Sequence, residues 1–169
     1  MQKTTWLAVM ILLGAISSFA DETPAGDVAA GYSFMHFGSS GGNAQGGSFS
    51  AAVNANRWFG IAGDFGVYSQ SSTKTFTYLA GPRFSVRTQS RITPYVETLF
   101  GGAHLTTSGF PGTNGFALLA GGGLDLGMSR SVALRPQVDY VAIRSGGTTL
   151  NAARISLGVA FHFGSQPSR

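Results

Sequence analysis

The segment Arg154-Ile155-Ser156-Leu157-Gly158-Val159-Ala160-Phe161-His162-Phe163 alternates strictly between large apolar side chains and small or polar ones. Its odd positions are apolar, whereas its even positions carry Arg, Ser, Gly, Ala and His. Successive side chains of a β-strand point to opposite faces, so this alternation predicts a strand with one apolar face and one polar or small face. The same pattern recurs along the chain from residue 27 onward.

The first twenty residues have the pattern of an export signal. Lys3 precedes an apolar run from Trp6 to Ile16, and Ser18-Phe19-Ala20 forms a small-x-small cleavage motif. These features predict a cleaved signal peptide over residues 1–20. A single membrane anchor is the alternative, but a run of about 11 apolar residues is shorter than the roughly 20 that a helix needs to cross a bilayer.

The composition excludes several classes of protein. Only 11% of the residues are charged, against about 25% in ordinary soluble domains. The basic residues are spread singly, without the runs that mark nucleic-acid-binding tails, so we expect no nucleic-acid partner. The chain has no cysteine, which excludes disulfides and thiolate chemistry. Mean hydropathy is +0.15, and no stretch after residue 20 is long and apolar enough to predict a membrane-spanning helix.

Eight strand-like segments are expected, at 27–37, 46–56, 58–69, 75–87, 92–104, 115–127, 132–143 and 152–163. Long polar stretches at 38–45, 70–74, 105–114 and 144–151 alternate with tight junctions near 57, 88–91 and 128–131. A sheet that is apolar outside and polar inside satisfies both hydrocarbon and water only as a closed membrane barrel. The sequence therefore predicts an all-β fold, an eight-stranded antiparallel up-and-down transmembrane β-barrel over 27–163, with short segments at 21–26 and 164–169.

Three prolines fall within the expected strands. Pro94 lies near a strand start, but Pro82 and Pro136 lie inside strands. Proline has no N–H to donate, and a closed barrel has no free edge, so we expect bulges or irregular pairing at Pro82 and Pro136.

Charged residues inside the expected strands fall opposite the apolar face. They are four acidic and four basic residues: Asp64, Arg83, Arg87, Glu97, Asp125, Arg135, Asp139 and Arg154. Counting from the turns predicts that Asp125 faces Arg135, that Arg83 faces Glu97, and that Asp64 approaches Arg83. Eight strands enclose a lumen just wide enough for side chains. We interpret these charges as a salt-bridge network that fills the lumen, because desolvated charges need partners.

No residue pattern indicates catalysis or metal binding. His36, His104 and His162 lack metal-ligand spacing and have no carboxylate cluster beside them. No acid lies near His104 to orient it for a serine nucleophile. Gly121-Gly122-Gly123 lacks the lysine of a phosphate-binding loop. We expect no enzyme activity, no cofactor and no metal.

The chain resembles the small outer-membrane β-barrel families of the OmpA and OmpX type, including short porin-like surface proteins. The resemblance rests on the signal peptide, on Leu79-Ala80-Gly81-Pro82-Arg83-Phe84 and Thr93-Pro94-Tyr95-Val96-Glu97, and on the last strand. The last strand matches the polar-x-Gly-x-x-hydrophobic-x-hydrophobic signal that the barrel assembly machinery reads. The residues at the defined positions of this signal are Ser156, Gly158, Phe161 and Phe163. Family members usually end on the aromatic residue, whereas six residues follow Phe163 here.

The resemblance implies the outer membrane of a Gram-negative-type bacterium, contact with its lipids and insertion by the assembly machinery. Our main hypothesis is a monomeric surface structural or interaction protein that presents four loops to an extracellular ligand or protein. A narrow porin-like channel for small solutes is the alternative. A soluble periplasmic lipocalin-like barrel is the second alternative. Such a barrel would bind an apolar ligand in its lumen, whereas the lumen expected here is lined by charged side chains. Phe110-Pro111-Gly112 in the third loop is either a contact point for a partner or a simple turn, and we favour the turn.

Overall fold

The computed structural model describes residues 24–38, 42–71, 73–87, 91–107, 109 and 111–164. The predicted signal peptide, Phe110 and the tail beyond residue 164 lie outside the described residues. In the part that is described, no helix is long and apolar enough to cross a membrane.

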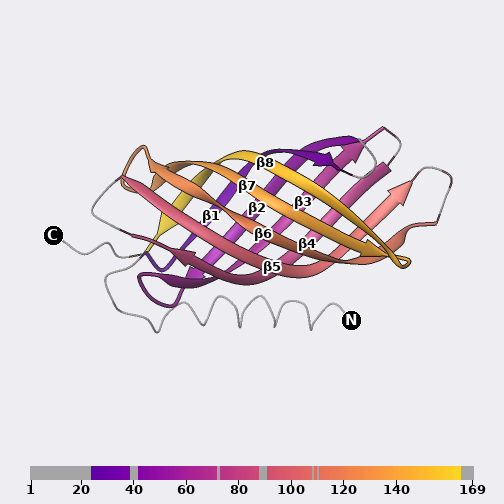
Figure 1. The fold of residues 1–169 in the computed structure, drawn as a ribbon. Coiled ribbons are helices and arrows are strands. Elements are labelled where there is room, and N and C mark those ends of the chain that lie inside the picture. Colours follow the sequence, from indigo (N-terminus) through magenta and orange to yellow (C-terminus); the bar gives the residue numbers. More distant parts are fainter. Residues whose placement is uncertain are drawn as a thin grey trace, which may run out of the picture.

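Eight antiparallel strands form a closed barrel in chain order, and β8 pairs with β1 to close it (Figure 1). This confirms the predicted fold, and each expected strand overlaps an observed one. The strands are β1 (Gly26–Phe37), β2 (Asn43–Asn54), β3 (Phe59–Gln70), β4 (Thr73–Ser85), β5 (Ile92–Thr107), β6 (Thr113–Gly127), β7 (Val132–Ser145) and β8 (Thr148–Phe163).

The connections differ from the prediction. We call the end with the β1–β2, β3–β4, β5–β6 and β7–β8 connections the loop end, and the opposite end the turn end. Long loops were expected at 70–74 and 144–151, but the strands continue into these polar stretches. Only two residues separate β3 from β4, and only two separate β7 from β8. Ser71, Gly146 and Gly147 have positive φ angles of 50°, 56° and 83°, as tight hairpins require. The predicted contrast between long loops and short turns is therefore wrong.

Side chains alternate between the exterior and the lumen along every strand, as predicted. Ile61, Val96 and Ile155 are each at least 60% exposed on the outside, whereas Leu99 and Leu119 are fully buried inside. The exterior is therefore an apolar surface suited to hydrocarbon.

Pro82 and Pro136 interrupt the hydrogen-bond ladder without bulges. Pairing of β4 with β5 is interrupted between Ala80 and Arg83 and resumes in unchanged register. On its other side Pro82 remains opposite Ile61 of β3. The β6–β7 ladder is interrupted in the same way beside Pro136. Irregular pairing, one of the two expected outcomes, thus accommodates both residues.

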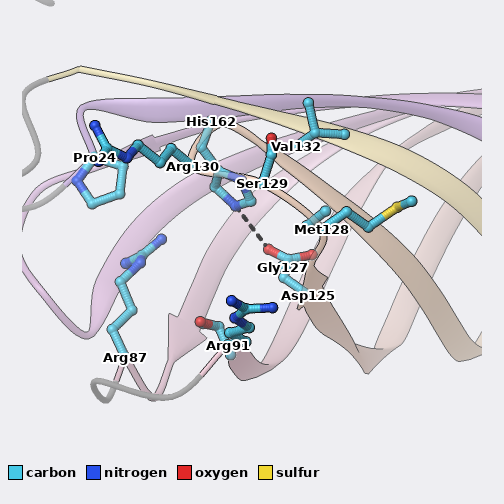
Figure 2. Close-up of a pocket in the computed structure, with 12 residues that line it drawn as sticks. Pro24, Arg87, Arg91, Asp125, Gly127, Met128, Ser129, Arg130, Val132 and His162 are labelled. Atoms are coloured by element: carbon cyan, nitrogen blue, oxygen red, sulfur yellow. Dashed lines mark hydrogen bonds and ion pairs between the residues drawn. The ribbon is translucent and has the colours of Figure 1, made fainter.

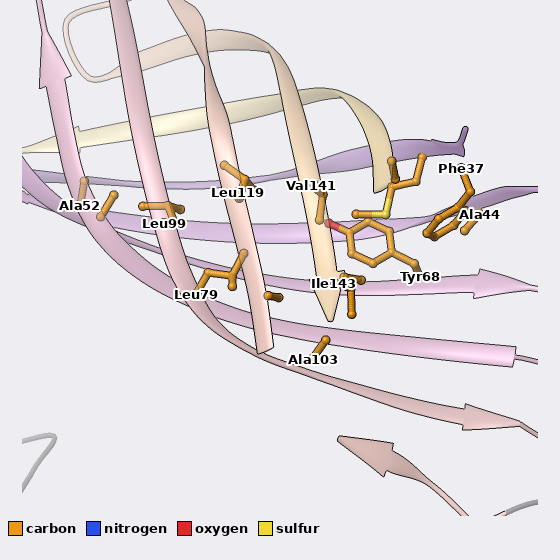
Figure 3. Close-up of a cluster of buried hydrophobic side chains, with 14 residues drawn as sticks. Phe37, Ala44, Ala52, Tyr68, Leu79, Leu99, Ala103, Leu119, Val141 and Ile143 are labelled. Atoms are coloured by element: carbon orange, nitrogen blue, oxygen red, sulfur yellow. The ribbon is translucent and has the colours of Figure 1, made fainter. Parts of the chain in front are cut away.

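The lumen is not polar throughout, in contrast with the prediction. Buried apolar side chains fill much of it (Figure 3). They reach the loop end, where Leu105 and Leu150 pack against them. We call this group the apolar cluster; it contains Met35, Phe37, Ala44, Ala52, Ala62, Tyr68, Leu79, Leu99, Ala103, Ala117, Leu119, Val141, Ile143 and Ala152. A charged network occupies another part of the described lumen.

Candidate functional site in the lumen

Arg154 of β8 is the centre of one part of this ion network. Its Nη1 lies 2.8 Å from Asp64 Oδ1, and its Nε lies 2.7 Å from Asp139 Oδ2. Nη1 also donates to the hydroxyl of Tyr68 at 2.9 Å. The Arg154 side chain is only 1% exposed, so each of these contacts replaces water that the guanidinium has lost.

The predicted approach of Asp64 to Arg83 is wrong. In the β3–β4 register Asp64 lies opposite Leu79, whereas Arg83 lies opposite Gly60, four residues nearer the turn end. The Asp64 carboxylate instead reaches across the lumen to Arg154 of β8.

Arg83 and Arg135 form a second part of the network, nearer the turn end. Arg83 Nε lies 2.7 Å from Glu97 Oε2, and Arg135 Nε lies 2.6 Å from Asp125 Oδ1. The structure thus brings both of these predicted cross-strand pairs into contact. Asp27 Oδ1 bridges the two arginines, 3.1 Å from Arg83 Nη1 and 2.8 Å from Arg135 Nη2.

Gln137 connects the two parts. Its Nε2 donates to Glu97 Oε1 and to Asp139 Oδ1, at 2.9 Å each. Its Oε1 accepts a hydrogen bond of 2.8 Å from the Tyr95 hydroxyl. The guanidinium carbons of the two arginines near the turn end lie 4.6 and 5.2 Å from the Tyr95 ring centroid, within the range of cation–π contacts. Gln137 and Tyr95 were not predicted as members of the network because they carry no charge, although both have lumen-facing parity.

Two other assignments need correction. Asp27 was not predicted as a member of the network, although its parity in the strand also points it inward.

Arg87 is not part of the network, because β4 ends at Ser85. Its Nη1 donates to the Arg57 carbonyl at 3.2 Å. Burial lowers the pKa of Arg87 below its ordinary value, against the opposing effect of Asp27 and Asp125. The described lumen therefore holds three arginines and five carboxylates.

The network is packed rather than open. A cavity of about 20 Å³ lies against Asp64, Arg135, Gln137 and Ser156, which is room for about one water molecule. Among the described residues, Arg83 Nη2 and Arg135 Nη1 are buried without a hydrogen-bond partner. The arrangement favours a fixed internal scaffold over a water-filled passage.

Two of the histidines lie at the loop end of the barrel and the third lies at the turn end. His36 and His104 each contact an asparagine on the neighbouring strand at the loop end, at 2.7 Å. His162 lies at the turn end, with Nε2 3.1 Å from Asp125 Oδ2. Within the described ranges, no group of three or more acidic, histidine or cysteine residues could hold a metal ion.

The four residues of the terminal-strand signal lie at the seam between β8 and β1. Ser156 and Gly158 face the lumen, while Phe161 and Phe163 are 53% and 40% exposed on the exterior. Gly158 lies opposite Gly31, where a Cβ on Gly31 would approach the Gly158 Cα to 2.5 Å. The glycine pair therefore allows the closing strands to approach.

No known family profile and no curated protein matches the chain. Among solved structures, Neisserial surface protein A (NspA) is similar with a TM-score of 0.70 and 22% identity, over 82% of this chain and 97% of that one. The N-terminal β-barrel domain of OprF from Pseudomonas aeruginosa gives 0.57 and 13%, over 82% and 98%. Ail of Yersinia pestis gives 0.54 and 18%, over 82% and 97%. At these identities the similarity establishes the fold alone.

Proposed function

Because the chain has the fold of the small outer-membrane β-barrels, as the resemblance to the OmpA and OmpX type predicts, we propose that it is a monomeric surface structural and interaction protein with a closed lumen. The observation that carries the proposal is that the ion network and the apolar cluster together block the lumen between the cavities at its two ends. Neither catalysis nor solute transport is part of the proposed role.

The lumen argues against the porin-like alternative. A conducting pore needs a hydrated path, and a selectivity constriction commonly presents a ring of one sign. Here arginines and carboxylates neutralise each other at contact distance. Leu99 and Leu119 are fully buried inside the lumen, where a pore would need water.

The exterior argues against a soluble lipocalin-like barrel. Large side chains such as Phe49, Phe100 and Leu157 are 50–54% exposed there. Soluble monomers rarely leave extensive contiguous apolar surface in water. Lipid contact, by contrast, satisfies these side chains.

Contacts with a partner would involve strand ends at the loop end, since two of the four connections there are tight turns. The described cations of this end are Lys74 and Arg144, both exposed. One of the similar structures is Ail in complex with the heparin analogue sucrose octasulfate. A polyanionic glycan is therefore the partner class that we propose for this rim, since exposed cations attract such ligands.

Conductance tests the closed lumen. Protein purified from outer membranes and reconstituted in planar bilayers should give no stepwise current, and neutralising Arg83 should not alter that baseline in the folded fraction. Regular current steps in the native protein that change with Arg83→Gln would establish the pore instead. Band shifts between boiled and unboiled samples provide the check that each variant is folded.

Glycan binding tests the interaction role. Cells that display the protein should bind heparin, and the double variant Lys74→Gln/Arg144→Gln should bind it several-fold less, since each lost cation weakens attraction at low salt. The matched control is Arg91→Gln/Arg130→Gln, which removes the same charge at the turn end. Equal binding by both variants would refute glycan recognition at the loop end.

A further inference from the structure

A groove of about 460 Å³ lies on the exterior of the barrel, across β2, β3, β4 and β5. The cavity at the turn end is lined partly by connections (Figure 2), whereas every residue that lines this groove belongs to a strand. Its floor consists of small exterior residues that lie opposite one another in register: Ala51 of β2, Gly63 of β3 and Ala80 of β4. The floor therefore crosses three neighbouring strands.

Larger side chains stand above this floor on both sides. The next exterior row toward the loop end is about half exposed and consists of Phe49, Phe65 and Tyr78. Phe100 of β5, opposite Ala80, closes one end of the groove. Toward the turn end, Val53 and Ile61 belong to the adjoining exterior row. Rows on one face of a sheet follow every second residue, about 7 Å apart, so the space between the two flanking rows fits a slender chain.

Gly63 deepens the groove, and the packing of the sheet does not require a glycine there. A Cβ at Gly63 would meet the Leu79 carbonyl oxygen at 3.5 Å, which is an ordinary van der Waals distance. At Gly102, by contrast, a Cβ would collide with the Tyr78 ring. The sheet can therefore hold a larger residue at position 63, and such a residue would fill the floor.

The groove lies deep in the hydrocarbon layer. An exposed polar row marks the loop end of the same face and consists of Gln45, Ser69, Lys74 and Thr106. Ala80 lies six positions after Lys74 on β4, which is about 20 Å along the strand and about 15 Å in depth at a strand tilt of about 40°. Half of a hydrocarbon core of about 30 Å is the same depth. Only the chains of lipids, and not their headgroups, reach this level.

We propose that this groove binds the acyl chain of a single phospholipid more tightly than the rest of the exterior does. The groove is continuous with the lipid-facing surface, and its floor and walls surround a chain on several sides, which multiplies van der Waals contacts. Asp64 is the one charged residue in the lining, and its carboxylate is turned into the lumen toward Arg154. The chain therefore meets apolar side chains.

A second copy of the barrel fits this groove less well. Small residues favour association of membrane-spanning segments because they let two backbones approach closely. Here the rings of Phe49, Phe65 and Phe100 protrude beside the small floor, each 46–50% exposed. They hold another barrel away from the floor, whereas a flexible chain passes between them.

Photo-crosslinking in nanodiscs tests the site. The purified protein is placed in phosphatidylcholine discs that contain a small fraction of phosphatidylcholine with a diazirine in the middle of one acyl chain. Mass spectrometry after irradiation identifies the labelled residues. In the native protein, labelling of the groove should exceed that of the exterior of β7, around Val138 and Tyr140, by about threefold or more. Gly63→Leu fills the floor and should abolish this excess.

The matched control is Gly47→Leu, which adds the same side chain to the exterior of β2 outside the groove. A Cβ there meets nothing closer than the Gly31 carbonyl oxygen at 3.7 Å, so this variant should be labelled as the native protein is. Ala80→Phe is a second filling variant and should act as Gly63→Leu does. Mobility shifts on boiling confirm that each variant is folded.

Three outcomes would overturn the proposal. The first is even labelling of the whole exterior in the native protein. The second is equal labelling of the groove in Gly63→Leu and Gly47→Leu. The third is a cross-link between two copies of the chain through the groove, which would assign the surface to a dimer.

Discussion

The ion network and the apolar cluster lie inside the same barrel and obey the same alternation, yet they are held together by different forces. Removing charges from water is costly and is offset only by contacts at hydrogen-bond distance, such as Arg154 with Asp64 and Asp139. The apolar cluster needs only matched volumes, and burial itself is favourable. The ion network therefore requires specific geometry, whereas the apolar cluster tolerates exchange of side chains of similar shape.

The largest effect is expected from Arg154→Leu. The change leaves Asp64 and Asp139 buried without their cation and should lower the free energy of unfolding by about 3–5 kcal/mol. Urea unfolding in lipid vesicles, followed by Trp58 fluorescence, measures it. The exposed Arg144→Leu is the control, with an expected change within about 0.5 kcal/mol. Equal effects of the two substitutions would contradict the role assigned to the network.

A similar but smaller loss is expected in the apolar cluster. Leu119→Ala removes a fully buried side chain and should cost about 2–4 kcal/mol through lost burial and a residual cavity. The same unfolding assay applies, with the exterior Leu157→Ala as control, since that side chain is 54% exposed. An effect at Leu119 no larger than at Leu157 would indicate that the cluster is loosely packed.

A double-mutant cycle on Arg83 and Glu97 measures the coupling between two members of the ion network. Arg83→Met alone leaves Glu97 Oε2 without its cation, whereas adding Glu97→Leu removes the stranded charge. The double variant should therefore be more stable than the sum of the single losses predicts, by about 1–3 kcal/mol. A cycle on Leu99 and Leu119, which face each other across β5 and β6, is the apolar reference. Simple additivity at Arg83 and Glu97 would show that the pair is uncoupled.

The smallest effect is expected where the two regions meet. Met35 and Arg154 are direct neighbours across the β1–β8 seam. Met35→Leu conserves volume and should cost less than about 1.5 kcal/mol, whereas Arg154→Lys cannot reproduce two-sided contacts and should cost more. Thermal unfolding of the two variants in one detergent ranks them. The reverse ranking would mean that shape, rather than hydrogen-bond geometry, limits this position.

Alternation along the chain predicted the barrel and its faces because a side chain's direction in a strand depends only on its position. Pairs such as Arg83 with Glu97 were predictable for a related reason, since hairpin neighbours are equidistant from their turn. Hairpin lengths at the loop end were mispredicted. Polar residues there indicated loops, whereas the backbone of β7 and β8 stays paired as far as Ser145 and Thr148.

By itself, the sequence determined which side chains enter the lumen and which face lipid, since period-two alternation is a local property. Only the tertiary structure decided which lumen residues meet across the barrel. Asp27 of β1 joins Arg83 of β4 to Arg135 of β7, and Asp64 of β3 meets Arg154 of β8. Contacts between non-adjacent strands depend on how the closed sheet tilts and staggers its strands, and no count of residues along one hairpin contains that information.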